Sequence, residues 1–405
     1  MLLFGRSVGR GRMKCAPVRG INNRRAVASL WLARLVYAIN WYNFAAIFTL
    51  VAQEMHQNVS GLGIAVGSFY LGVGLFQIPG GILAAKIGPK QTALYGTLLA
   101  SVAAFLTSLA GAFSQLIVLR FLVGAGMAFV FPAAVILMAR YFRERAEGFS
   151  VGLLNSAFYV GGALGISGWA VLADAWGWRE SLATSGGAGV LSVLLMLFLV
   201  PPDPIREDFA MEVAEVRRIV ASRWLLLLGA TLFGVTGLSS LVSGFMVFYL
   251  ENAQNASATL AGSVGALSLL GSLISAPLFG VLHDRIRNTA WIAFLCGLLG
   301  LAGLEVTSLM TIPAAIFASL IVGFASGGAM TVGFSAATKL THGEYQTLAV
   351  ACINSTQLFA GFFFPPLFAW SVLEFGYSTA WVVSGLYVLP FLLAALLTKF
   401  KNFAN

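Results

Sequence analysis

Charge is scarce in this chain of 405 residues, since charged side chains make up 10% of it and hydrophobic side chains 59%. The mean hydropathy is +0.88. A water-soluble protein could not cover its surface with so few polar groups, so the composition predicts an all-α integral membrane protein. The apolar runs are continuous rather than alternating, which excludes a membrane β-barrel.

Residues that carry most enzyme and metal chemistry are also rare. The 3 cysteines have neither CxxC nor metal-ligand spacing, and the 3 histidines fall between the apolar runs. No Gly-x-x-x-x-Gly-Lys-[Ser/Thr] loop is present to cradle a nucleotide. No cluster of His, Cys or carboxylates lies within an apolar run, so we expect no enzyme, no cofactor and no metal.

Twelve runs are long enough to span a bilayer, which takes about 20 mostly apolar residues. They lie at approximately 28–52, 60–84, 91–111, 115–139, 147–172, 180–200, 224–250, 257–281, 289–309, 312–337, 344–372 and 377–399. Six precede and six follow a polar stretch. The sequence therefore predicts a basic tail (1–25), an N-terminal six-helix half (26–200), a linker (201–223) and a C-terminal six-helix half (224–400).

The basic residues predict the orientation. Of the 24 Lys and Arg, all except Arg34, Arg120 and Arg179 fall on the side that holds both termini. The positive-inside rule makes that side cytoplasmic, so the net charge of +9 indicates topology rather than nucleic-acid binding. We expect a multi-pass protein of the cell inner (plasma) membrane with both termini cytoplasmic.

The tail 1–25 contains neither Asp nor Glu. It lacks the apolar core of a secretory signal, which is about 7–15 residues long, and its glycines disfavour the amphipathic helix of an organellar transit peptide. We expect a disordered cytoplasmic tail. Both Met1 and Met13 stay open as the start of translation.

The two halves repeat the same landmarks at an offset of 199 residues. The repeated pairs are Gly81 with Gly280, Lys86 with Arg285, Asn155 with Asn354, Gly162 with Gly361, and Gly177 with Gly376. Such an offset indicates duplication of a six-helix unit. In membrane proteins, a parallel repeat of this kind is typical of a two-halved secondary transporter.

Three motifs resemble those of the major facilitator superfamily. The loop Gly280–Arg285 reads GVLHDR and matches the family's Gly-x-x-x-Asp-Arg signature, while Arg120–Gly126 reads RFLVGAG and matches its Arg-x-x-x-Gly-x-Gly pattern. Trp176–Arg179 (WGWR) is a further feature of this family. The resemblance covers residues 26–400. It implies twelve helices around one central site, which opens in turn to either face of the membrane.

The resemblance implies a gate at the cytoplasmic loops. There Asp284 would meet the positive end of the helix that starts near residues 148–150 and latch one half against the other. The first-half copy has Ala85 at the matching position. The alternative is a loop charge that only sets topology. The predicted gating residues are Gly280, Asp284, Arg285, Gly81 and Lys86, together with Pro365 and Pro366, which predict a kink in run 344–372.

Arg120 is the most costly residue to place in a membrane, at about 2.5–3.5 kcal/mol for an arginine within a span. The family resemblance implies a role in substrate binding or proton coupling, and a carboxylate is the natural partner of a guanidinium. The alternative is a structural arginine bound to backbone carbonyls. Arg34 lies about six residues from the cytoplasmic edge of its run, so we expect it to snorkel to the interface.

The acids that usually couple such a carrier to protons are missing. No Asp or Glu lies near the middle of any run, and Glu305 comes closest. The anion:cation symporter branch, which this chain resembles, has Asp-Arg in its first span and a Glu seven residues after the span-4 arginine. The matching residues here are Asn43, Phe44 and Met127. The Gly-Pro pair typical of efflux antiporters is absent from run 147–172.

Uncharged polar and aromatic residues gather at the middle of runs expected to line the central site. The predicted substrate-binding residues are Arg120, Asn40, Trp41, Tyr42, Asn43, Tyr70, Asn155, Tyr159, Asn354 and Gln357. The alternative for the amides is that they hydrogen-bond helices to one another. For the aromatic residues the alternative is packing or a lipid-facing position.

The sequence therefore predicts a secondary active or facilitative transporter for a small organic solute, a monocarboxylate-like anion being the leading hypothesis. The alternatives are a facilitator of a neutral polar solute, a drug or metabolite:proton antiporter, and a non-transporting membrane sensor. The expected partners are a small-molecule substrate and the lipid bilayer, with no nucleic acid. A monomer is expected, while a co-transported proton or other ion stays open.

The gate hypothesis makes a testable prediction. Asp284→Asn should impair transport far more than Ala85→Asp, because only the second-half loop carries the charge that forms the latch. Uptake into vesicles measures both variants. Equal effects of the two substitutions would remove the latch.

Overall fold

The computed structural model describes residues 22–139, 141, 147–202, 213–286, 288–339 and 345–397. Residues 1–21 of the predicted tail and 203–212 of the predicted linker lie outside the described residues. So do the side chains of Ala85 and Asp284, and the latch between the halves therefore stays a prediction.

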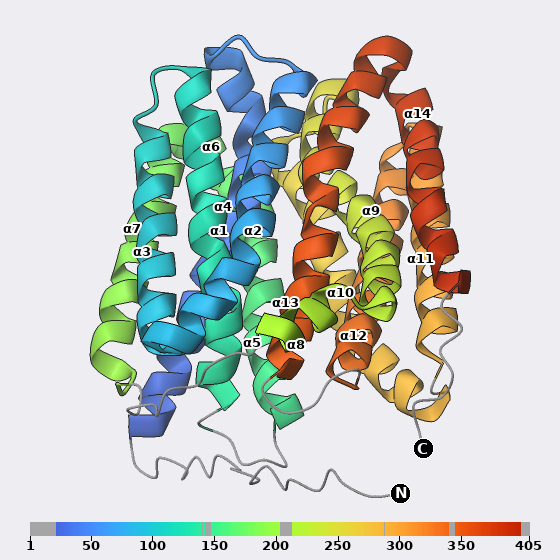
Figure 1. Ribbon diagram of the computed structural model, residues 1–405. Helices are drawn as coiled ribbons and strands as arrows, with labels where there is room; N and C mark the ends of the chain where they lie inside the picture. The colour runs from blue at the N-terminus through green and yellow to red at the C-terminus, as the bar shows by residue number, and fades with distance from the viewer. Residues whose placement is uncertain are drawn as a thin grey trace, which may run out of the picture.

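The described residues form helices and contain no strand. In lipid, a single apolar segment must satisfy its backbone hydrogen bonds within itself, and a helix does so. Helices α1–α7 (blue to green) form one side of the bundle, and α9–α14 (yellow to red) form the other (Figure 1). The elements are α1 (Asn22–Glu54), α2 (Val59–Ile87), α3 (Pro89–Ser108), α4 (Phe113–Ala139), α5 (Glu147–Ala163), the π-helix η2 (Leu164–Gly168), α6 (Trp169–Trp176), α7 (Trp178–Leu199), α8 (Val213–Val220), α9 (Arg223–Ala253), α10 (Ala258–Ile286), α11 (Thr289–Val306), the 3₁₀-helix η3 (Thr307–Leu309), α12 (Ile312–Lys339), α13 (Tyr345–Leu358) and α14 (Ala360–Leu397).

Ten stretches of the described residues are long and apolar enough to cross a membrane. The last of them, Leu348–Ala394, has 47 residues and is divided at Gly376, whose φ of 76° breaks α14. A further helix of 20 residues, α3, packs between α4 and α7. These segments confirm the predicted all-α membrane fold of twelve crossing helices in two six-helix halves.

The internal repeat reappears at the helix crossings. A Cβ on Gly124 of α4 would lie 2.1 Å from the carbonyl oxygen of Phe69 in α2. A Cβ on Gly323 of α12 would lie 1.8 Å from the carbonyl oxygen of Ser268 in α10. Both glycines therefore mark places where two backbones touch and no side chain fits. The same crossing is built once in each half.

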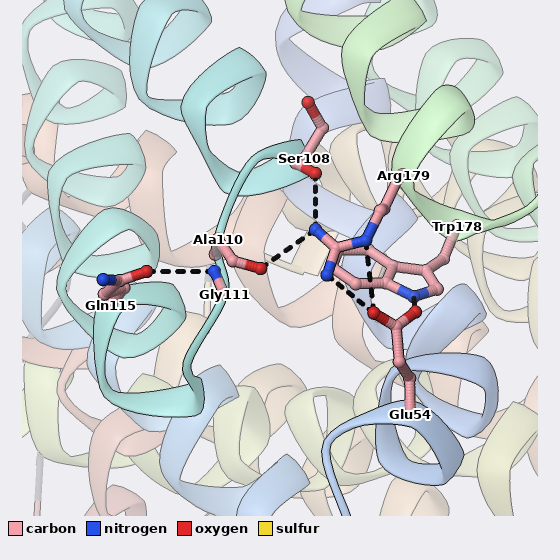
Figure 2. Close-up of polar contacts among 7 residues, drawn as sticks. All are labelled: Glu54, Ser108, Ala110, Gly111, Gln115, Trp178 and Arg179. Carbon is pink, nitrogen blue, oxygen red and sulfur yellow. Dashed lines mark hydrogen bonds and ion pairs between the residues drawn. The ribbon is translucent and has the colours of Figure 1, made fainter.

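A cluster of hydrogen bonds fastens the end of the N-terminal half that the charge distribution predicts to be external (Figure 2). Arg179 at the start of α7 donates from Nη2 to Glu54 Oε1 over 2.6 Å and from Nη1 to the carbonyls of Ser108 and Ala110 over 2.8 and 2.9 Å. Trp178 Nε1 donates to Glu54 Oε2 over 2.7 Å. One guanidinium thus joins α1, the α3–α4 loop and α7.

The C-terminal half contains a neutral counterpart of this cluster. Gly177 and Gly376 both have positive φ, at 94° and 76°, and each precedes the last membrane segment of its half. Ser378 Oγ donates to the carbonyl of Ser308 over 2.8 Å, in the place where Arg179 reaches Ser108. The duplicated backbone is therefore retained while the charge is confined to the first copy.

We expect Arg179→Ala to destabilise the N-terminal half by about 1–3 kcal/mol, because it removes an ion pair and leaves two carbonyls without their donor. The midpoint of thermal unfolding in detergent should fall. Glu180→Ala, one residue along the same helix, removes an exposed charge without such contacts and should change the midpoint little. A midpoint unchanged by Arg179→Ala would show that the cluster adds nothing.

The α1–α5 contact gives a second prediction. A Cβ on Gly161 would lie 2.2 Å from the carbonyl oxygen of Leu35, whereas one on Gly168 would meet nothing within 4 Å. Gly161→Ala should therefore lower stability by about 1–3 kcal/mol through overpacking, while Gly168→Ala should not. Equal unfolding midpoints for the two variants would contradict this close approach.

Candidate functional site

A cavity lies where α1, α2, α4 and α9 meet, between the two halves. Aromatic side chains and one arginine face small residues and serine hydroxyls across it. Its lining residues are Trp41, Tyr42, Phe44, Ala45, Ala65, Val66, Phe69, Tyr70, Arg120, Ser240, Ser243 and Gly244.

Arg120 supplies the positive charge of this cavity. Its side chain is only 1% exposed, and Nε and Nη2 have no hydrogen-bond partner among the described residues. The guanidinium lies over the rings of Phe44 and Phe69, at 4.8 and 5.9 Å from their centroids. Rings stabilise a cation but accept none of its in-plane N–H bonds. The arginine therefore presents unused donors in a water-poor site.

The packing of α4 fixes where this guanidinium lies. Gly124, one turn after Arg120, brings α4 against the backbone of α2 at Phe69. A Cβ on Gly126 would lie 2.5 Å from the backbone nitrogen of Ala100 in α3. The Arg-x-x-x-Gly-x-Gly pattern thus describes a helix held between two neighbours with its arginine at a set depth. This gives the motif a physical reason.

The aromatic wall of the cavity is internally bonded. Trp41 Nε1 donates to the hydroxyl of Tyr70 over 3.3 Å. The Trp41 ring meets the rings of Phe69 and Tyr70 edge to face, at 4.9 and 5.6 Å. Such pairs restrict ring movement. The Tyr70 hydroxyl accepts the bond from Trp41, and its own O–H group can still donate to another acceptor. The cavity lining therefore contains a neutral hydrogen-bond donor as well as Arg120.

The two halves touch at the end of the bundle that the charge distribution predicts to be external. Thr49 of α1 donates to the carboxylate of Glu251 of α9, and Asn252 donates to Thr49 over 3.2 Å. Phe48 and Phe248 pack with their centroids 5.7 Å apart. These contacts join α1 to α9 at that end.

The structure brings only part of the predicted substrate-binding set to the cavity. Trp41, Tyr42, Tyr70 and Arg120 line it. Asn40 instead donates to the carbonyl of Ser185 in α7 over 3.3 Å, and Asn43 donates to the Ser185 hydroxyl over 3.0 Å. Both amides point into the N-terminal half. They join α1 to α7, which was the alternative reading of such residues.

The remaining predicted residues lie outside the cavity lining. Gln357 donates to Asn354 over 2.7 Å and accepts from Thr236 over 3.3 Å, so these amides bond within the C-terminal half. Asn155 and Tyr159 of α5 are half-buried. Their part in substrate binding stays a prediction.

The predicted gating residues occupy two levels of the bundle. Pro365 and Pro366 of α14 pack against Gly63 of α2, where a Cβ would lie 2.9 Å from the Pro365 carbonyl oxygen. At the other level, Gly81 has open space around its Cα and Gly280 meets only the Thr331 methyl group, at 3.8 Å. Lys86 and Arg285 are exposed. A gating role for all of them stays a prediction.

Sequence reasoning missed Phe44 and Phe69, on whose rings the Arg120 guanidinium lies. The available signal was the spacing of Tyr37, Trp41, Phe44 and Phe48, which places four aromatic rings on one face of α1. The expectation for Arg34 was wrong. Its side chain is 5% exposed, because aromatic rings from three helices enclose it and it does not snorkel.

The sequence profile of the Major Facilitator Superfamily matches residues 30–253 and 230–402. The chain therefore belongs to this superfamily, as its motifs indicated.

Several relatives are named for organic anions. The chain is 28% identical over 267 residues to the probable sulfoacetate transporter of Cupriavidus necator, a match covering 61% of this chain and 62% of the relative. It is 22% identical over 307 residues to a probable galactarate/D-glucarate transporter of Escherichia coli, covering 65% and 68% of the two chains. The chain thus spans about three fifths of the length of the sulfoacetate relative.

Solved structures share the fold at low sequence identity. A bacterial homolog of the human lysosomal transporter Spinster, in an inward-facing and unoccupied conformation, superposes with a TM-score of 0.78 at 15% identity, covering 93% of this chain and 98% of that one. A nucleoside transporter superposes with a TM-score of 0.76 at 10% identity, covering 93% and 100%.

Proposed function

We propose that this protein is a secondary transporter that carries a small, monocarboxylate-like organic anion by alternating access. The observation that carries the proposal is Arg120, a buried arginine with unused donors in a cavity between the two halves. A carboxylate or sulfonate would accept two parallel N–H bonds from such a fork. An anion would also neutralise the buried charge of Arg120, which a neutral solute would leave unpaired, so the site should favour the anion.

The relatives support an anionic substrate. Sulfoacetate, galactarate and glucarate, for which two of them are named, each carry two anionic groups, so they support an anionic substrate but not a single charge. Arg120 belongs to the cavity lining and can pair with one anionic group of the substrate.

The contacts between the halves suggest how the cavity opens. Thr49, Glu251 and Asn252 hold the predicted external end closed. Rocking of the halves would break these bonds, open the predicted external end and close the opposite end, which is the rigid-body exchange typical of duplicated transporters. The predicted location in the inner membrane, the cytoplasmic termini and the monomeric state belong to this proposal.

Coupling to an ion is left to experiment. Acidic residues at the family's usual coupling positions are replaced by Asn43 and Met127. Asn43, which bonds to Ser185, has an amide, and Met127, which is 1% exposed, has a thioether. Neither group titrates, so neither can take up a proton. We therefore expect uptake to respond weakly to an inward proton gradient.

A neutral polar solute is the second candidate. The hydrogen bond between Trp41 and Tyr70 and the serines of α9 would suit a hydroxylated solute, in which case Arg120 would be structural. Drug:proton antiport and a sensor without flux have no comparable observation in their favour.

Uptake into proteoliposomes tests the proposal. The purified protein should take up labelled sulfoacetate or lactate, and Arg120→Gln should lower uptake by at least about 100-fold, as expected from losing a buried charge-assisted pair. Labelled glycerol serves as the neutral solute, and each assay is run with and without an inward proton gradient.

Arg223→Gln is the matched control, because Arg223 also stacks on an aromatic ring, that of Trp224 at 4.6 Å, but is exposed. It should leave uptake unchanged. Anion uptake that survives Arg120→Gln, or uptake of glycerol alone, would make Arg120 structural and favour the neutral-solute alternative.

A further inference from the structure

A second buried arginine lies outside the cavity lining. Arg34 of α1 is 5% exposed, and its Nε and Nη1 atoms have no hydrogen-bond partner among the described residues. Like Arg120, it forms no ion pair with a described carboxylate. Among the described residues, the N-terminal half thus holds two buried arginines without an ion-pair partner, although an unpaired charge in a membrane span is costly.

Three aromatic rings enclose the Arg34 guanidinium, each from a different helix. The distances from its central carbon to the ring centroids are 4.3 Å for Tyr37 in α1, 4.6 Å for Phe131 in α4 and 4.5 Å for Phe158 in α5. Ring faces stabilise the cation and exclude water. The Tyr37 hydroxyl also bonds to this guanidinium, but Nε and Nη1 have no acceptor among the described residues, so an anion placed there would supply the missing acceptors.

The rings around Arg34 pack against rings that line the central cavity. Phe158 lies 6.0 Å from Trp41 and 5.8 Å from Tyr42, between ring centroids, and both of these residues line the cavity. Tyr37 lies 5.6 Å from Trp41 in the same way. A chain of ring contacts through Phe158, Trp41 and Phe69 therefore connects the two arginines.

One face of α1 carries both arginine contacts. Arg34 stacks on Tyr37 and Arg120 stacks on Phe44, and these rings are two helical turns apart, or about 10 Å along the axis. Trp41 lies between them on the same face. The Arg34 end is the one that the charge distribution predicts to face the cytoplasm. Arg34 therefore lies nearer than Arg120 to the predicted cytoplasmic side.

We infer that Arg34 forms a second anion-binding site, which takes the carboxylate or sulfonate group of the substrate on the cytoplasmic side of the central cavity. The inference rests on the proposed function. The guanidinium would bind the anionic group through Nε and Nη1, and the three rings would hold the adjoining carbon skeleton. If the substrate passed from Arg120 to Arg34, its anionic group would stay paired with a guanidinium while it crossed the aromatic rings between them.

Equilibrium binding of radiolabelled sulfoacetate to the purified full-length protein tests the inference. The wild type should bind about two anions per molecule, Arg34→Gln and Arg120→Gln about one each, and the double variant almost none, since each guanidinium supplies one bidentate site. Arg223→Gln should bind as the wild type does. The unfolding midpoint of each variant is measured alongside.

The outcomes separate this inference from the proposed function. If Arg34→Gln binds as the wild type does and Arg120→Gln binds nothing, the second site is overturned while the central site stands. If Arg120→Gln keeps full binding and Arg34→Gln loses it, the central assignment falls and the Arg34 site stands. Wild-type protein that binds no anion overturns both.

If Arg34→Gln fails to fold, Arg34→Lys tests the second anion-binding site instead. It keeps the charge over the rings but loses the planar fork, so one of the two sites should weaken about 10-fold. Unchanged affinity at both sites would overturn the second site.

Discussion

The structure of the central cavity depends on one uncompensated charge, the guanidinium of Arg120. Burying an ion costs several kcal/mol unless a partner of opposite charge repays it, and the rings of Phe44 and Phe69 return only about 0.5–2 kcal/mol through cation–π attraction. The cavity is therefore electrostatically incomplete until an anion enters. That deficit makes a small anion bind more favourably than a neutral solute of the same shape.

The rest of the N-terminal half keeps this charge in place. Backbone contacts at Gly124 and Gly126 hold α4 between α2 and α3, so the Cα of Arg120 has a fixed position relative to these helices. The Arg179–Glu54 cluster fixes the predicted external ends of α1 and α7. Such rigidity is the condition for rocking motion, because each half must move as a unit while the contacts between halves break and reform.

The sequence predicted those features that depend on composition and spacing. Apolar runs set the twelve segments, and the 199-residue offset is reproduced by the positive φ of Gly177 and Gly376. It could not predict which face of a span meets the cavity, because a helix that is apolar all round carries no amphipathic signal. Asn40 and Arg34 were misjudged for this reason, since only the neighbours that fold against α1 decide whether a polar side chain meets another helix, an aromatic cage or the interface.

The central claim is that Arg120 binds the anionic group of the substrate, and a cryo-electron microscopy structure of the purified protein with sulfoacetate tests it most directly. The account predicts density for the anion between Arg120 and Tyr70, with oxygen atoms within about 3 Å of Nε and Nη2 of Arg120. An empty cavity at saturating sulfoacetate, with the Arg120 donors bonded to backbone carbonyls, would contradict it.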